Sequence, residues 1–157
     1  MSSTDQLYFA TGLPPAQAAR ALADALGMSL REDDDGVYVY RRWEQDGVDH
    51  ELGGPVDRNS HHFEPDPDPL PEDSSVMDGH DTEWDVHLYP DDEDTLHRRT
   101  KELFAAAASL GWPTVLVFDV ARLAAASGPD GRVAEFPPGT SPYGAHRALW
   151  APYALPG

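Results

Sequence analysis

The stretch "MSLREDDDGVYVYRRWEQDGVDHELGG" (residues 28–54) decides the fold. It contains three β-prone runs, at 28–32, 36–43 and 47–54, which are separated only by short polar turns. Parallel strands need a crossover connection of a dozen or more residues, so strands this close in sequence are expected to pair as antiparallel hairpins. The group Gly53-Gly54-Pro55 is expected to stop or bend the third of them.

The sequence around this stretch adds two helices and further strands. An apolar stripe predicts a helix over "AQAARALADALG" (16–27), and a second one predicts a helix over residues 91–111, whose acidic start suits a helix N-terminus. Strands are predicted at 6–10 and 112–120, and at 83–90, where alternation places Trp84, Val86 and Leu88 on one face and Glu83, Asp85, His87 and Tyr89 on the other.

The remaining segments are less regular. Residues 57–81 are rich in proline and acidic residues, which favours a long loop. Residues 119–128 suggest a short helix capped by Asp119, 130–136 a final strand, and 137–157 an irregular tail across the surface. We therefore predict one α+β domain over residues 1–157, a two-layer sandwich with a mainly antiparallel sheet and two main helices on one face.

The charge limits the classes of partner. The chain of 157 residues has 28 acidic and 11 basic residues, which gives a net charge of −17. Such a surface repels nucleic acid and anionic membranes and attracts basic proteins. A generally acidic soluble protein and a salt-adapted protein are alternative explanations of this charge.

Several classes of function are disfavoured by what the sequence lacks. The absence of cysteine excludes disulfides, thiolate metal sites and a cysteine nucleophile. The start of the chain has no signal-peptide pattern, and no run approaches the ~20 apolar residues of a membrane span, so a cytoplasmic protein is expected. No phosphate-binding loop is present, and "GTSPYG" (139–144) lacks the spacing of a nucleophile elbow.

Histidines next to carboxylates raise the question of a metal site. His61 and His62 stand beside Glu64 in "RNSHHFEPDPDPLPED" (58–73). Neighbouring residues of an extended chain point in opposite directions, and no helix fixes these ligands, so we predict no metal and no cofactor here. Exposed histidines that titrate near neutrality are the preferred interpretation.

One strand offers a candidate catalytic pair. Asp85 and His87 share a strand face with Glu83, at a spacing of about 7 Å between alternate residues. A carboxylate–imidazole pair of this kind can act in acid–base chemistry. The polar outer face of a sheet is the simpler interpretation, so no residue is assigned as catalytic.

Acidic residues around exposed aromatics predict a protein interface instead. Tyr89 is expected on the outer face, and Trp150 is a second candidate aromatic. A solvated loop with no partner is the alternative. The predicted partner-binding residues are Asp66, Asp68, Glu72, Asp73, Asp78, Asp81, Glu83, Asp85, Tyr89, Asp91, Asp92 and Glu93.

Three segments resemble a known class of protein. They are "LYFATGLPPAQAARALADALG", "GVYVYRR" and "WDVHLYPDDEDTLHRRTKELFAAAASLGWPTVLVFD". Together they are similar, in the order of elements and the style of motif, to the small cytoplasmic immunity proteins of bacterial polymorphic-toxin and contact-dependent inhibition systems. The resemblance implies a protein that binds and blocks a cognate toxin domain, often a basic nuclease.

The leading hypothesis is therefore a non-enzymatic, acidic inhibitor of a basic toxin or nuclease domain. One alternative is a small enzyme, such as a metal-assisted hydrolase, that uses Glu83, Asp85 and His87. A second alternative is an inhibitor whose rows of carboxylates imitate DNA. The sequence leaves the oligomeric state open.

Overall fold

The computed structural model of the chain describes residues 3–63, 70 and 74–156. The strands and helices are β1 (Asp5–Phe9), α1 (Pro15–Leu26), β2 (Ser29–Asp33), β3 (Gly36–Gln45), β4 (Val48–Arg58), α2 (Ser60–Phe63), β5 (Thr82–Tyr89), α3 (Glu93–Ala107), β6 (Thr114–Phe118), β7 (Arg122–Ser127), β8 (Val133–Glu135) and α4 (Arg147–Trp150). Short 3-10 turns η2 (Ala108–Leu110), η3 (Gly144–His146) and η4 (Ala151–Tyr153) complete the set.

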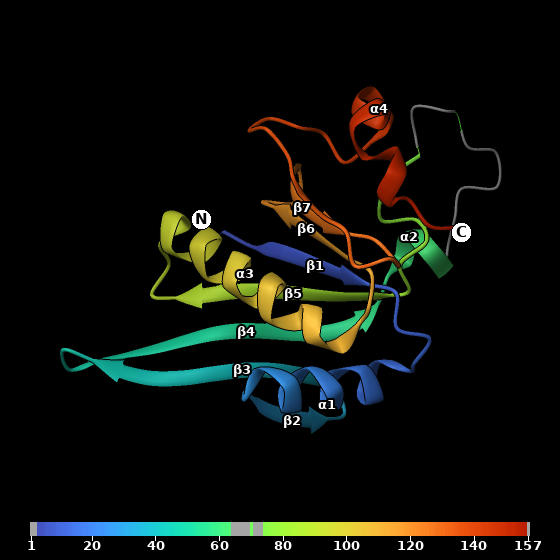
Figure 1. Cartoon of the computed structure of the whole chain (residues 1–157). Coiled ribbons are helices and arrows are strands. Elements are labelled where there is room, and N and C mark those ends of the chain that lie inside the picture. Colours follow the sequence, from blue (N-terminus) through green and yellow to red (C-terminus); the bar gives the residue numbers. More distant parts are fainter. Residues whose placement is uncertain (1–2, 64–69, 71–73, 157) are drawn as a thin grey trace.

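All strands belong to one antiparallel sheet with the order β2-β3-β4-β5-β1-β6-β7-β8 (Figure 1). The hairpins predicted from residues 28–54 are confirmed, since β3 pairs with both β2 and β4. Strand β1 lies in the middle of the sheet, between β5 and β6. The predicted α+β class and the antiparallel sheet are therefore confirmed.

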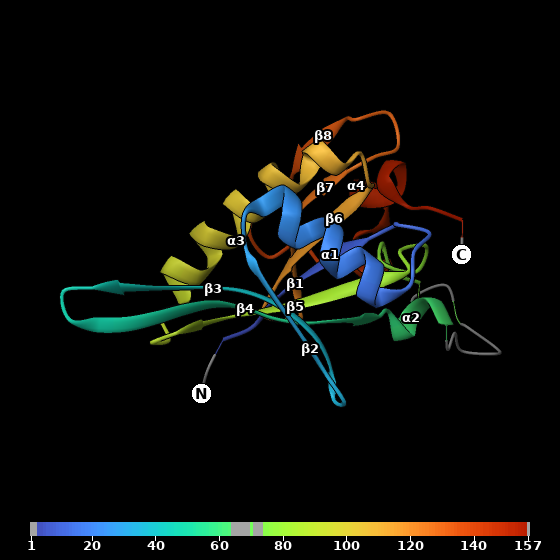
Figure 2. The ribbon, with the colours of Figure 1, turned by 90° about the horizontal axis from the view of Figure 1, so that it is seen from below.

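The two main helices, α1 and α3, lie on the same side of β3, β4 and β5 (Figure 2). Their buried residues join Leu7, Phe9, Val39, Trp84 and Val86 in one apolar core. Helix α1 ends at Gly27, which adopts the left-handed conformation (φ 64°) that glycine tolerates best. Helix α3 starts at Asp92, whose side chain accepts the Thr95 N–H. No helix in the described part of the chain is long and apolar enough to cross a membrane.

A second, smaller core covers only one half of the opposite face of the sheet. There Trp150 and Tyr153, with Val76 and Met77, pack on side chains of β1, β6 and β7. Trp150 is 1% exposed, and its indole N–H donates to the Tyr143 carbonyl at 3.0 Å. The C-terminal tail and residues 76 and 77 of the predicted loop therefore contribute to a core, and Trp150 is a core residue in this structure.

One local prediction is wrong, and one of the two alternatives given for a second segment is excluded. The residues predicted as a helix over 119–128 form the β6–β7 turn and strand β7, because this alanine-rich segment pairs with β6 and β8 and is buried on both faces. The chain also does not stop at Gly53-Gly54-Pro55, since β4 continues to Arg58. A Cβ on Gly54 would lie 2.0 Å from the Asp85 carbonyl oxygen, so glycine permits the close approach of β5.

Candidate functional site

The second core covers only one half of the sheet face that lies opposite the helices. We call the other, uncovered half of this face the open face. It is formed by the outward side chains of β2, β3, β4 and β5, and no other described element packs on it in the view of Figure 2. Directly opposed residues of neighbouring strands project to the same side, which assigns the members of the face from the strand register. These are Arg31, Tyr38, Tyr40, Arg42, Glu51, Asp57, Glu83, Asp85, His87 and Tyr89.

Tyrosines and arginines make up one part of the open face. The guanidinium carbon of Arg31 lies 4.4 Å from the centre of the Tyr38 ring, and that of Arg42 lies 5.1 Å from the Tyr40 ring. Tyr89 is 68% exposed, and it borders a hollow of about 470 Å³ at the end of the sheet, which is lined by Arg42 and Glu51 of the open face and by Trp43 and His50 of the opposite face. Tyr38 and Tyr40 are partly buried, so Tyr89 is the exposed tyrosine of this face. Surface tyrosines supply contact area at a low entropic cost, which is typical of binding surfaces.

Three carboxylates make up the other part. Asp57 and Glu83 face each other across β4 and β5, and Asp85 follows two residues later on the same face. Burial raises the pKa of Asp85 from 3.8 to about 6, and the charges of Glu83 and Asp57 act in the same direction. None of the three forms an ion pair with a basic side chain in the described ranges. This carboxylate triplet (Asp57, Glu83 and Asp85) therefore concentrates uncompensated negative charge.

The two predicted residues in the 74–81 segment have internal hydrogen-bond partners. Asp81 accepts the Thr11 and Gly12 N–H groups, at 3.1 and 2.8 Å, and holds the loop between β1 and α1. These bonds lower the pKa of its carboxyl below its usual value, against the effect of burial. Asp78 accepts the hydroxyl of Ser75 at 2.7 Å. The structure thus places both carboxylates in local turns.

The start of α3 holds three more predicted residues. Asp91 accepts the Ser3 N–H at 3.2 Å, Asp92 caps the helix, and Glu93 contacts both His97 and Arg122. All three are exposed. The predicted residues Asp66, Asp68, Glu72 and Asp73 lie outside the described residues, so the structure groups only Glu83, Asp85 and Tyr89 of the predicted set on the open face.

The predicted histidines are only partly described. The side chain of His61 lies outside the described part, while His62 is half-buried with Nδ1 3.0 Å from the Asp78 carbonyl oxygen. His62 is therefore not the solvent-exposed residue that we predicted, because the ordered turn at 75–79 packs beside it. His87 is exposed as expected from the alternation, with Nδ1 3.0 Å from the Thr4 hydroxyl.

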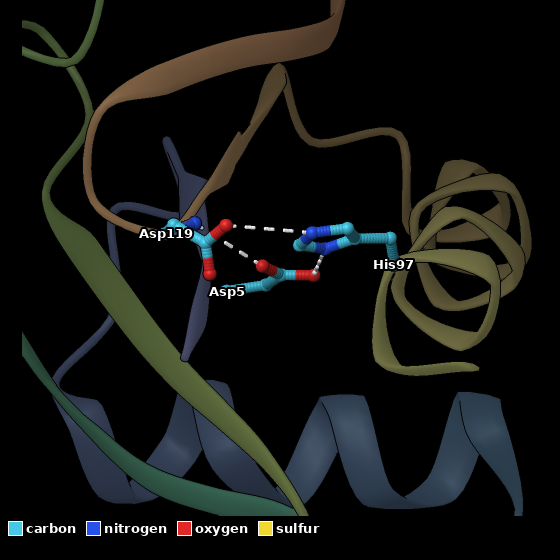
Figure 3. Close-up of side chains that lie close together, drawn as sticks. All are labelled: Asp5, His97 and Asp119. Atoms are coloured by element: carbon cyan, nitrogen blue, oxygen red, sulfur yellow. Dashed lines mark hydrogen bonds and ion pairs between the residues drawn. The ribbon is translucent and has the colours of Figure 1, made fainter. Parts of the chain in front are cut away.

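A cluster that sequence reasoning missed lies on the other side of the sheet. Asp5 from β1, His97 from α3 and Asp119 from the β6–β7 turn point toward one another (Figure 3). His97 Nδ1 lies 2.8 Å from Asp5 Oδ2, and His97 Nε2 lies 3.4 Å from Asp119 Oδ2. Among the described residues, this is the one group of three metal-ligand side chains close enough to hold an ion.

Asp5 is the buried member that organises this cluster. It is fully buried, and it accepts the Thr100 hydroxyl at 2.7 Å and the Asp119 N–H at 3.2 Å in addition to His97. Burial raises the pKa of Asp5, although these hydrogen bonds oppose the shift. Burial acts to lower the pKa of His97, but Asp5, Glu93 and Asp119 outweigh it, so that the pKa is raised.

The backbone of the β6–β7 turn is strained where it joins the cluster. Asp119 and Val120 both have positive φ, 53° and 67°, which is unfavourable for a β-branched residue. The N–H groups of these two residues are held by β1, since Asp119 donates to Asp5 and Val120 donates to Gln6 Oε1 at 3.0 Å. No sequence signal joined Asp5, His97 and Asp119, because they come from three elements that are far apart in the chain.

We compared the chain with protein-family models, curated proteins and solved structures. None of them matches.

Proposed function

We propose that the protein is an acidic cytoplasmic inhibitor that binds a basic partner protein through the open face, and that it acts as an immunity protein neutralising a toxin or nuclease domain. The observation that carries this proposal is the uncovered half of the sheet, where the exposed Tyr89 and the partly buried Tyr38 and Tyr40 share one face with the carboxylate triplet in a chain of net charge −17. Immunity is the class suggested by the resemblance of the sequence segments.

The carboxylate triplet favours a cationic occupant. Like charges directly opposite each other on a sheet are unfavourable, and partial burial of Asp85 adds to the cost of its ionised form. A lysine or arginine side chain placed between these carboxylates relieves both costs at once. The free energy of this relief contributes to binding, so the triplet favours a basic partner over a neutral one.

The tyrosines of the open face are expected to set the dissociation rate of the complex. Tyr89 is 68% exposed and has room to become buried against a partner, and the rings of Tyr38 and Tyr40 are contacted by the guanidinium groups of Arg31 and Arg42. Aromatic side chains of this kind dominate the energy of many interfaces. The net charge accelerates encounter over roughly a Debye length, while the tyrosines slow dissociation. A partner held in this way has its active site occluded.

The experiment separates the two contributions. The first step is co-purification of the chain with the product of the adjacent gene, followed by binding kinetics at low and high salt. The open-face variant Asp57→Asn/Glu83→Gln/Asp85→Asn changes the net charge from −17 to −14. The matched control Asp24→Asn/Glu102→Gln/Glu135→Asn makes the same change of charge at exposed positions away from the open face.

We expect both variants to lower the association rate by a similar factor, because both lose the same net charge. Only the open-face variant should dissociate faster, by about tenfold or more, since only it loses contacts with buried cations. A dissociation rate equal to that of the wild type in the open-face variant overturns the assignment of the surface. An association rate that does not change with salt overturns the electrostatic part.

A further inference from the structure

We propose that a hollow between helix α3 and the strands β3 and β4 binds a small aromatic carboxylate. The hollow has a volume of about 200 Å³ and is lined by Arg41, Trp43, Leu52 and Arg99. Arg41 and Trp43 share a strand face with Val39 of the main core, so the hollow lies on the helix side of the sheet. Helix α1 covers only the other end of β3 (Figure 1). The open face is on the opposite side, so this inference does not depend on the proposed inhibitor function.

Two guanidinium groups line this hollow with little compensating negative charge. Arg41 Nη2 donates to the Leu26 carbonyl at 2.8 Å, and within residues 3–63, 70 and 74–156 no carboxylate lies at ion-pair distance from Arg41. Arg99 Nη1 lies 3.4 Å from a carboxylate oxygen of Glu102. Two cations that share one hollow repel each other, and an anion placed between them relieves this repulsion. The hollow therefore favours an anionic ligand, although the chain as a whole is acidic.

A buried hydrogen-bond donor of Arg99 supports this choice independently. Its Nε is buried and has no hydrogen-bond partner in the described part of the chain. Buried donors are rarely left unpaired in proteins, because the loss of their hydrogen bonds to water is costly. A carboxylate can accept two parallel N–H bonds from one guanidinium group. A carboxylate that enters the hollow beside Arg99 therefore satisfies the unpaired donor.

The other lining residues select the body of the ligand. Trp43 and Leu52 supply apolar walls, and both belong to or pack on the main core. The Trp43 ring stacks on His50 with 5.2 Å between centroids, and the guanidinium carbon of Arg99 lies 5.8 Å from the centre of the Trp43 ring. Planar groups on these walls favour a flat ring, and the volume of about 200 Å³ limits the ligand to a small molecule.

The net charge of −17 limits the charge of the ligand. It repels every anion at long range, and the repulsion grows with the number of charges on the ligand. A monocarboxylate is therefore favoured over phosphate, which carries more charge and has no apolar part to place against Trp43 and Leu52. These features together define the ligand as one ring with one carboxylate.

The test is a titration of the wild-type chain with benzoate, followed by calorimetry and by tryptophan fluorescence. We expect one equivalent to bind, and we expect Trp43→Phe to remove the fluorescence change. Benzyl alcohol and inorganic phosphate should bind at least about tenfold more weakly, since the first lacks the anion and the second lacks the ring. Arg41→Met, Arg99→Met and Arg99→Lys should each lose at least about tenfold in affinity for benzoate, because lysine keeps the charge but not the planar fork.

The matched control is Arg98→Met, which removes the same charge from the neighbouring, exposed position of α3 and should leave the affinity unchanged. Circular dichroism confirms that each variant is folded, and Arg99→Lys is the variant least able to disturb the fold. The absence of saturable benzoate binding to the wild type overturns the proposal. An affinity that is unchanged in Arg41→Met and Arg99→Met, or lowered equally in Arg98→Met, overturns it as well. Phosphate binding as tight as benzoate binding overturns the choice of an aromatic ligand.

Discussion

Replacing Asp85 with asparagine should stabilise the protein at neutral pH. The folded protein raises the pKa of this carboxyl from 3.8 to about 6, chiefly by burial and then through Glu83 and Asp57. A pKa change of one corresponds to 1.36 kcal/mol, so a pKa rise of about two corresponds to a free-energy cost of about 3 kcal/mol for a fully buried carboxylate. Asp85 is only half-buried, so solvent screening reduces the expected gain to about 1–2 kcal/mol.

The stabilisation by Asp85→Asn should increase as the pH rises. Because the pKa of Asp85 is higher in the folded than in the unfolded state, unfolding releases a proton, and this group destabilises the protein as the pH rises from about 4 to about 6. Below pH 4 the carboxyl is protonated in both states and contributes nothing. Asparagine resembles the protonated acid, so the gain should be present at pH 7.5 and absent at pH 3.5.

Urea unfolding at the two pH values, followed by tryptophan fluorescence, measures the difference in free energy of unfolding. Asp34→Asn, in the exposed turn between β2 and β3, is the control and should change the stability by less than about 0.5 kcal/mol at either pH. A loss of stability for Asp85→Asn at pH 7.5, or an equal gain at both pH values, would refute the account of the triplet as a site of uncompensated charge.

Three further predictions concern other parts of the chain. His80 is fully buried and its pKa is lowered from 6.5 to about 4, so stability should fall by about 3 kcal/mol as the pH drops from 7 to 4, and His80→Leu should abolish this fall in urea titrations. Trp150→Ala should lower the free energy of unfolding by about 3–5 kcal/mol, because it leaves a cavity in the second core. A decrease below about 1 kcal/mol would contradict the packing of Trp150 described above. Val120→Gly should raise the thermal midpoint, with a gain of about 1 kcal/mol, because glycine tolerates the left-handed turn and Val120 is exposed.

Local patterns predicted much of the fold. The alternation over residues 83–90 assigned both faces of β5, and the carboxylates before α3 marked its start. The short turns between β2, β3 and β4 left no room for crossover helices. These features depend on neighbours in the sequence, which is why periodicity and turn chemistry were sufficient.

Features that depend on distant contacts were not predictable in this way. Strand β7 has the alanine content of a helix, and its pairing with β6 and β8, together with the burial of both its faces, explains its extended form. Which half of the sheet stays open depends on where Trp150 and Tyr153 pack. Asp5, His97 and Asp119 come from β1, α3 and the β6–β7 turn, so no local spacing could bring them together.

The position of β1 has a consequence for folding during synthesis. Its neighbours β5 and β6 begin only at Thr82 and Thr114, so β1 has no partner while the intervening residues are being synthesised. Strands β2, β3 and β4 can pair as soon as they emerge, whereas the apolar side chains of Leu7 and Phe9 must wait for the sheet to close around them. Such long-range closure folds slowly. We therefore expect the insertion of β1 to limit the folding rate and the unpaired β1 of the nascent chain to be a target for chaperones.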